Sequence, residues 1–196
     1  MADLPVPHRH SATRQRGFTL SELLVTLTIV GITASIGVPM LTKFLQDADV
    51  STQADYVIGA LNFTRSEAVK RNVRVTMCRS TDGTSCAAAA GGTADWRSGW
   101  IIFTDTGTLG TPDGTDAVLR VQGRIKGKAV LLGAGGVADY VSYSASGQPR
   151  LIDGTTQTGT FTACVTSIKV SRRQVALTAG TGWVGVSLLA GAATCN

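Results

Sequence analysis

A stretch without any charged residue runs from Leu23 to Leu41 and consists mostly of Leu, Val, Ile, Ala, Gly and Thr. In helical form, about 20 apolar residues span the hydrocarbon core of a bilayer, which is roughly 30 Å thick. A secretory signal peptide is the alternative, but its apolar region covers about 7 to 15 residues and ends at a small-residue cleavage site. Because this stretch is longer and "GITASIGVP" offers no clean site, we expect a retained membrane helix.

The charges beside the stretch predict its orientation. Three arginines precede it between residues 9 and 16, whereas its other flank carries Lys43 together with Asp47 and Asp49. Positively charged flanks remain in the cytoplasm. We therefore expect a cytoplasmic N-terminus, a single pass through the inner membrane, and the remainder of the chain in the periplasm.

The residues "RGFTLSELLVTLTIVGI" resemble the class III leader junction of type IV pilins and type II secretion pseudopilins. This resemblance implies that a prepilin peptidase cuts after Gly17 and that the new N-terminal residue, Phe18, is then N-methylated. The family acid four residues beyond that Phe is matched by Glu22, and the family's helix-bending proline is matched by Pro39. The resemblance divides the chain into a leader peptide (1–17), a transmembrane and filament-core helix (18–45) and a periplasmic globular domain (46–196).

The position of Glu22 needs a physical reason. A carboxylate near the edge of hydrocarbon costs about a few kcal/mol unless an opposite charge balances it. Cleavage after Gly17 would create a positive amine on Phe18, and Glu22 of one subunit can pair with that amine on a neighbour in a filament. The alternative is a Glu22 side chain that simply lies among the lipid headgroups.

The rest of the chain has the pattern of one small α+β domain. Apolar residues recur at helical spacing, which predicts that the helix continues over residues 43–71 with one face on a sheet and ends at Asn72. These apolar positions are Val50, Ala54, Val57, Leu61 and Ala68.

Glycine occurs 23 times, and the pattern of the later segments predicts short strands between turns. We expect strands over residues 73–79, 99–105, 117–121, 128–133, 139–144, 159–165, 168–171, 174–178 and 183–189, and a loop at "CAAAAGGTAD". A long helix followed by strands predicts a helix packed on antiparallel sheet, in agreement with a pilin-like fold.

A second resemblance narrows the family. "ADWRSGWIIFTDTG" and the later "DAVLRV" resemble the GspH/FimT group of minor pilins and pseudopilins. The group's middle strand carries a Trp, a Gly-Trp pair and an aromatic residue before an Asp. Here these residues are Trp96, Gly99, Trp100, Phe103 and Asp105. "SASGQP" at 144–149 also resembles a family turn. We expect Trp100, Ile102 and Phe103 to make core or inter-strand contacts rather than a ligand platform.

The four cysteines all follow the membrane stretch, in what should be an oxidising compartment. Four cysteines allow three pairings. The nearest-neighbour choice joins Cys78 to Cys86 and Cys164 to Cys195, and free thiols are the alternative. Zinc is not expected, because the chain has no C-x-x-C pair and both histidines lie in the leader.

Several observations argue against an enzyme, a metal site or a bound cofactor. Without His8 and His10 the mature chain has no histidine, so Ser-His-Asp and Cys-His arrangements are impossible. No P-loop or G-x-G-x-x-G motif occurs. "DTGTLGTPDGTDAV" contains three aspartates but lacks the ligand order of an EF-hand, so we expect a hairpin loop. A carboxylate-pair hydrolase remains an alternative that no motif supports.

Three functions remain, and one of them, an enzyme on a membrane anchor, has no motif to support it. The first is a minor pilin or pseudopilin that joins or primes a type IV pilus or a type II secretion pseudopilus, with prepilin peptidase and other pilins as partners. The alternative is a minor pilin that binds DNA for natural transformation. Some FimT-like proteins do so through a Gly-Arg-x-Arg motif near the last strand. The aligned residues here are Gly182, Trp183, Val184 and Gly185, so both arginines are absent. Arg172 and Arg173 could supply charge from an earlier position.

Basic residues form three clusters that could neutralise phosphates or simply be solvated surface. The clusters are Lys70, Arg71, Arg74 and Arg79; Arg120, Arg124, Lys126 and Lys128; and Lys169, Arg172 and Arg173. The net charge of +5 is mildly basic and identifies no partner by itself.

Overall fold

The computed structural model describes residues 17–165, 172–189 and 195 of the 196-residue chain. The chain divides into two compact units, Met1–Leu41 and Thr42–Asn196. One helix, α1 (Leu20–Arg71), contributes its first part to the first unit and its second part to the second. We refer to the second as the globular unit.

The end of α1 agrees with the prediction from the sequence. The helix ends at Arg71, and Asn72 follows with a φ of 55°. Asn tolerates this left-handed conformation better than most residues, and it is common directly after a helix. The backbone N–H of Asn72 donates to the carbonyl of Val69 at 3.3 Å, which closes the last turn.

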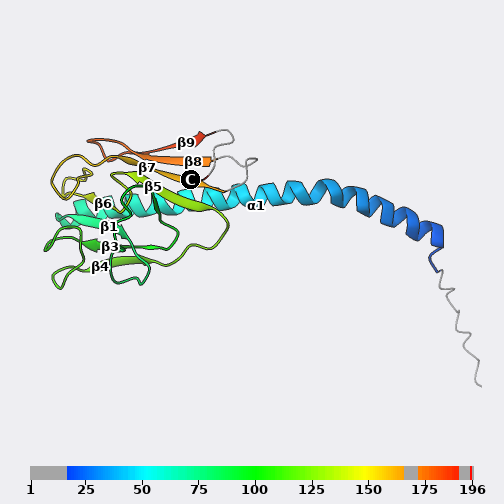
Figure 1. Ribbon diagram of the computed structural model, residues 1–196, viewed down its shortest axis with the longest axis horizontal. Helices are drawn as coiled ribbons and strands as arrows, with labels where there is room; N and C mark the ends of the chain where they lie inside the picture. The colour runs from blue at the N-terminus through cyan, green and yellow to red at the C-terminus, as the bar shows by residue number, and fades with distance from the viewer. Residues whose placement is uncertain (1–16, 166–171, 190–194, 196) are drawn as a thin grey trace, which may run out of the picture. The chain divides into compact units, whose positions relative to one another are not determined.

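Two antiparallel sheets follow the helix (Figure 1). The first has the order β4-β3-β1-β6, with β1 (Val75–Arg79), β3 (Trp100–Thr104), β4 (Val118–Gln122) and β6 (Tyr140–Tyr143). The second has the order β2-β5-β7-β8-β9, with β2 (Ala94–Asp95), β5 (Val130–Gly135), β7 (Gly159–Cys164), β8 (Arg172–Leu177) and β9 (Val184–Leu189). The α+β class with a helix on antiparallel sheet is confirmed.

One hydrophobic core joins α1 to both sheets. The five apolar positions predicted from helical spacing are all buried, and Val57, Leu61 and Ala68 are fully so. They pack in the same cluster as Met77 of the first sheet and Phe161 of the second. Burial of these side chains on both sides of the helix supplies most of the energy that holds the unit together.

Three strand predictions need correction or comment. Ala94 and Asp95 were expected in a loop, but they pair with β5 as the short strand β2. β8 begins at Arg172 rather than at residue 174, because its pairing with β7 extends to Arg173 opposite Ala163. The expected strand at 168–171 lies outside the described residues. The aspartate-rich segment does join β3 to β4 as a hairpin loop, as predicted.

Candidate functional site

The expected processing junction lies directly before α1. Gly17, Phe18 and Thr19 are exposed and precede the helix. The hydroxyl oxygen of Thr19 accepts a hydrogen bond from the backbone N–H of Glu22 at 3.3 Å. Thr19 is therefore the N-cap residue of α1, and Thr-x-x-Glu has the spacing of a capping box.

Glu22 thus has a local role that the sequence analysis does not identify. Its exposed side chain lies in the first turn of α1, where the partial positive charge of the helix N-terminus favours a carboxylate. The pairing of Glu22 with the amine of Phe18 on a neighbouring subunit remains a prediction. Any test of that pairing must leave the helix cap intact.

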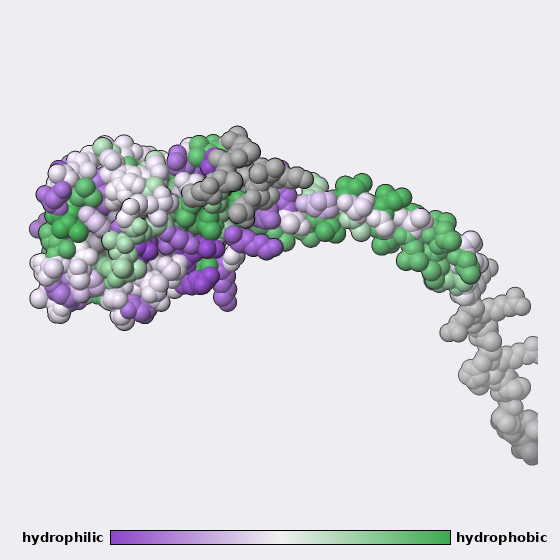
Figure 2. Space-filling model, viewed as in Figure 1, coloured by the Kyte–Doolittle hydropathy of each residue, from purple (hydrophilic) through white to green (hydrophobic). Residues whose placement is uncertain are grey.

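The first part of α1 exposes large apolar side chains around its circumference, and Figure 2 shows its near face as mostly apolar. Among the described residues, α1 is the one helix long and apolar enough to cross a membrane. Its exposed large side chains in this part are Leu20, Leu23, Leu24, Val25, Leu27, Ile29, Val30, Ile32, Ile36, Val38, Met40 and Leu41. A helix that is apolar all round is stable in hydrocarbon or against other helices, but not in water.

The hydroxyl groups between Leu23 and Leu41 are satisfied by the helix itself. Each donates to a backbone carbonyl three or four residues earlier, at distances between 2.6 and 3.1 Å. The residues are Thr26, Thr28, Thr33 and Ser35. Because an unsatisfied polar group in hydrocarbon costs several kcal/mol, these bonds make the segment compatible with a bilayer despite its four hydroxyls.

Pro39 lies inside α1, and the helix is continuous through it. Proline has no N–H, so the carbonyl of Ser35 loses its usual partner four residues later. This places a weakened turn close to Leu41, where the first unit ends. The role of Pro39 in filament assembly remains a prediction.

The tryptophans of the family-like motif are core residues, not a ligand platform. Trp96 is fully buried, and its indole N–H donates to the carbonyl of Ala138 at 2.9 Å. Its ring meets that of Phe161 edge-on with centroids 5.2 Å apart, and that of Trp100 at 6.3 Å. The ring of Trp96 therefore connects the motif to the second sheet. Trp100, Ile102 and Phe103 are buried as predicted.

The glycine of the motif is required by a close approach of backbones. Gly99 has a φ of 113°, which side chains with a Cβ rarely adopt. A Cβ at this position would collide with the carbonyl of Gln122 on the neighbouring strand β4. The Gly-Trp pair therefore allows β3 and β4 to meet at this end of the hairpin.

Asp105 joins a chain of polar side chains that the sequence analysis does not identify. Its carboxylate accepts hydrogen bonds from the hydroxyl of Thr76 and from the backbone N–H of Gly110, the latter at 2.9 Å. Thr76 Oγ1 lies 2.9 Å from Ser142 Oγ, which accepts a bond from Arg74 at 3.0 Å. Burial raises the pKa of Asp105, although these hydrogen bonds oppose the effect. The network ties the β3–β4 loop to β1 and β6.

The other carboxylates of that loop hold its backbone. Asp113 accepts hydrogen bonds from the backbone N–H groups of Thr108 and Thr115 at 2.7 and 2.8 Å, and Asp116 accepts one from Thr106 at 2.9 Å. The bond from the Thr108 backbone is the largest cause that lowers the pKa of Asp113 to about 2. Within the described ranges, no group of three or more His, Cys, Asp or Glu side chains is placed to hold a metal ion.

All four cysteines are paired in disulfides. Cys78 on β1 is bonded to Cys86, and Cys164 at the end of β7 is bonded to Cys195. The Cα atoms lie 5.5 and 6.0 Å apart, within the range of protein disulfides. These are the two pairs that the nearest-neighbour choice selects. The first closes the loop after β1, and the second ties residue 195 to the second sheet.

Comparisons with known proteins identify the family. The model of the family described as Type II transport protein GspH matches residues 53–182, which is more than half of the chain. The chain belongs to the GspH family. The prokaryotic N-terminal methylation motif also matches, over residues 12–38, which contain the junction and the start of α1. No curated protein matches the chain.

Two crystal structures of the type IV minor pilin FimU from Pseudomonas aeruginosa share the fold of this GspH-family chain. Each is 17% identical to it, with TM-scores of 0.50 and 0.52. The matches cover 70% and 74% of this chain and 91% and 92% of the FimU chains. At this identity the similarity concerns the fold, which is pilin-like as predicted.

The first basic cluster of the GspH-family chain is used within the fold. Lys70 and Arg71 lie 3.7 and 2.6 Å from the carboxylate of Glu67, in the last turns of α1. Arg79 donates to Asp139 at 2.8 Å, and the fourth member belongs to the polar network described above. These side chains are therefore engaged with neighbours rather than gathered into an open phosphate-binding patch.

The other two clusters are more exposed. Arg120 lies 5.6 Å from the centre of the Phe63 ring, in a cation–π contact. Arg124, Lys126 and Lys128 are exposed in the segment between β4 and β5, and Arg172 and Arg173 are half-buried at the start of β8. Lys169 lies outside the described residues.

The residues aligned with the DNA-binding motif are placed at the turn before β9. Gly182 is buried with a φ of 65°, and Trp183 is 69% exposed. Val184 and Gly185 begin β9. This turn offers an aromatic ring but no positive charge, so it lacks the group that would bind a phosphate.

Proposed function

We propose that this chain is a minor pilin or pseudopilin subunit, made with a leader and assembled into a type IV pilus or a type II secretion pseudopilus. The observation that carries the proposal is the methylation motif at 12–38, which coincides with an exposed junction and a capped apolar helix. Gly17 and Phe18 lie just outside the first turn, where a peptidase can reach an extended chain. Membership of the GspH family supports the same role.

The proposed assembly mechanism depends on the relative stability of α1 in the membrane and in the filament. The apolar surface of residues 20–41 is stable in the inner membrane, but it can be buried equally well against the same surface of other subunits in a filament. In the bilayer, the Glu22 carboxylate of a single subunit is favoured by the partial positive charge of the helix N-terminus. In a filament it would meet the Phe18 amine of a neighbour, which favours transfer from membrane to filament.

The partners and location follow from this role. Prepilin peptidase would remove residues 1–17, and other pilins or pseudopilins would surround residues 18–45. The arginines that precede the helix support a cytoplasmic N-terminus and a periplasmic globular unit. The domain boundaries given by the sequence analysis are part of this proposal, as is a structural rather than an enzymatic role.

Processing is tested by mass spectrometry of the protein from membranes of cells that express prepilin peptidase. The expected N-terminus is N-methylated Phe18. A mature N-terminus at any other residue, or an intact leader in the presence of active peptidase, would contradict the proposal.

The role of Glu22 is tested with Glu22→Gln. Gln keeps the capping-box geometry but removes the charge, so the helix should still begin at the same residue. The variant should insert and be cleaved normally, yet fail to enter filaments. Ser35→Ala, which leaves both the charge and the cap at Thr19 intact, is the matched control and should assemble. Normal assembly of Glu22→Gln would show that the charge has no such role.

A further inference from the structure

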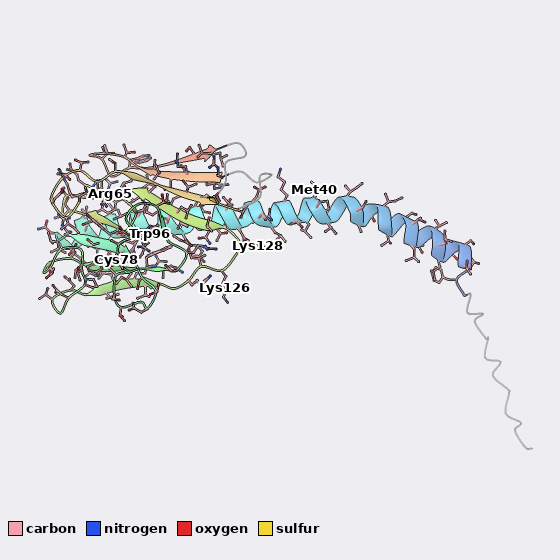
Figure 3. All side chains as sticks on the ribbon, viewed as in Figure 1. Met40, Arg65, Cys78, Trp96, Lys126 and Lys128 are labelled. Atoms are coloured by element: carbon pink, nitrogen blue, oxygen red, sulfur yellow. A yellow bond between two sulfur atoms is a disulfide. The ribbon has the colours of Figure 1, made fainter. Side chains whose placement is uncertain are left out.

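Exposed cations gather at one end of the globular unit. Arg124, Lys126 and Lys128 lie in the segment between β4 and β5, and the backbone N–H of Lys128 donates to the carboxylate of Asp49 on α1 at 3.1 Å. A Cβ on Gly127 would lie 3.2 Å from the same carboxylate. The segment is therefore held against α1 near residue 49, and Figure 3 shows Lys128 near the helix and Lys126 further from it.

A second group of cations, distant in the sequence, reaches the same end. β5 begins at Val130, which pairs with Cys164 at the end of β7, and Arg173 of β8 pairs with Ala163. Arg173 also lines a hollow together with Phe44 and other residues of the same part of α1. Arg173 and the Lys126–Lys128 segment, which belong to the two more exposed basic clusters, thus lie beside the same part of α1, where it enters the globular unit.

We call this set of side chains the basic rim, and it consists of Lys43, Arg124, Lys126, Lys128 and Arg173. The carboxylates facing it are those of Asp47 and Asp49. Asp49 already accepts the hydrogen bond from the Lys128 backbone, and Asp47 lines the hollow with Arg173. The cations of the rim therefore exceed the carboxylates beside them.

The other end of the unit carries charges of both signs, because Lys70, Arg71 and Arg74 lie there together with Glu67 and an aspartate-rich loop. The β3–β4 loop carries Asp105, Asp113 and Asp116 and has no Lys or Arg between residues 105 and 117. Its position is given by the hydrogen bond from the Asp105 backbone N–H to the carbonyl of Arg74, just beyond the end of α1. Mainly cations thus lie where α1 enters the unit, whereas cations and carboxylates lie together where it ends.

The basic rim cannot lie far from the end of the apolar segment. Lys43 is two residues beyond Leu41, and Asp49 is eight residues beyond it. At about 1.5 Å per helical residue, the eight residues span about 12 Å, whichever direction the apolar segment takes. The headgroup layer is about 5 to 8 Å deep on each side of the bilayer core. Phe44 and Leu45 are 67% and 56% exposed, and aromatic and apolar side chains favour this interfacial depth.

We propose that the basic rim binds the phosphates of anionic phospholipids in the leaflet nearest the globular unit, and so holds the unit against the membrane before assembly. This proposal rests on the part of the proposed function in which α1 spans the inner membrane before the subunit is assembled. Release of the rim would then accompany the departure of α1 from the bilayer. DNA offers the same phosphate chemistry, but a rim within about 12 Å of the bilayer is poorly accessible to a duplex, and the test distinguishes the two.

The test uses the full chain in nanodiscs of phosphatidylcholine alone or with added phosphatidylglycerol. Lysines are modified briefly with a water-soluble acetylating reagent and quantified by peptide mass spectrometry. Each Lys or Arg near an anionic membrane surface increases the binding constant about fivefold. We expect modification of Lys126 and Lys128 to fall about fivefold in anionic discs at low salt and to recover at high salt. Lys70, whose side chain is 75% exposed at the other end of α1, is the internal control and should not change.

A second test removes two positive charges from the basic rim but keeps Lys126 and Lys128, whose modification is measured. Arg124→Gln/Arg173→Gln should reduce the protection of Lys126 and Lys128 in anionic discs, whereas Arg65→Gln/Arg71→Gln, which removes the same charge from the last turns of α1, should not. Equal modification in both kinds of disc would overturn the proposal, as would stronger protection by added duplex DNA in neutral discs than by anionic lipid. Co-elution of the chain with the discs reports membrane anchoring separately. If the membrane anchoring in the proposed function is wrong, the chain will fail to enter the discs.

Discussion

At the scale of single residues, the most informative group is the carboxylate of Asp105. Burial is the largest cause of its raised pKa, and the hydrogen bonds from Thr76 and Gly110 oppose that effect without cancelling it. The folded protein therefore holds the proton of this group more tightly than the unfolded chain does. Its contribution to stability is fully present below the unfolded pKa of about 3.9 and is lost as the pH rises through the folded value.

This sign gives a prediction for Asp105→Asn. Asn is uncharged at every pH, so it avoids the cost of a buried carboxylate while it keeps an oxygen that can accept hydrogen bonds. The stability of the variant relative to wild type should therefore increase as the pH rises above about 4. Thermal unfolding in detergent at several pH values measures the difference. A difference that stays constant with pH would show that the carboxylate is not penalised by burial.

Trp96 supplies a second prediction at this scale. Trp96→Phe removes the hydrogen bond to the Ala138 carbonyl and leaves a void beside Phe161. The free energy of unfolding should fall by about 1 to 3 kcal/mol. Trp183→Phe is the matched control, because Trp183 is 69% exposed and its change should stay within about 0.5 kcal/mol. Equal losses at the two positions would contradict the core role of Trp96.

At the scale of elements, α1 serves two environments with two kinds of surface. In its first part the apolar side chains point outward in every direction, whereas beyond Val50 they occupy the face that packs on the sheets. The cap at Thr19 and the left-handed residue Asn72 define its two ends. The helix therefore begins with an apolar surface in the first unit and continues into the globular unit without a break.

The disulfides give a prediction at the scale of elements. Cys164 and Cys195 are 31 residues apart, whereas Cys78 and Cys86 are 8 apart. In the chain-entropy model the longer loop contributes about 4 kcal/mol and the shorter about 2.5 kcal/mol. Cys164→Ala/Cys195→Ala should therefore lower the unfolding temperature more than Cys78→Ala/Cys86→Ala does. Nonreducing peptide mapping of the wild type should find the same two pairs, and complete alkylation of all four cysteines would contradict them.

At the scale of the whole molecule, the distribution of charge decides what DNA binding would look like. The lysines and arginines of the basic rim offer charges that bind phosphates, and the turn before β9 lacks the arginines of the DNA-binding motif. We expect full-length protein in neutral nanodiscs to bind labelled duplex weakly and without sequence preference. If all five rim cations contact phosphate, affinity should fall by roughly 500-fold between about 50 and 200 mM salt. Tight binding at physiological salt would favour the DNA-uptake function instead.

The sequence by itself determines the parts of this protein that depend on local order. The apolar stretch, the spacing from Gly17 to Glu22 and the helical repeat from Val50 to Ala68 are each contained within one segment. Helix formation and recognition of a junction depend on neighbours a few residues apart, so such features can be identified without a fold. The class of fold follows as well, because a long helix followed by many short strands has few ways to bury its apolar faces.

The tertiary structure alone decides which distant residues meet. Ala94 and Asp95 become a strand only because β5 lies beside them, and Trp96 is buried because Phe161 of the second sheet supplies its neighbour. The network around Asp105 draws on three separate segments, and the basic rim joins Lys43, the β4–β5 segment and β8. No pattern within one segment predicts these meetings, because strand pairing brings together residues whose separation in the chain carries no periodic signal.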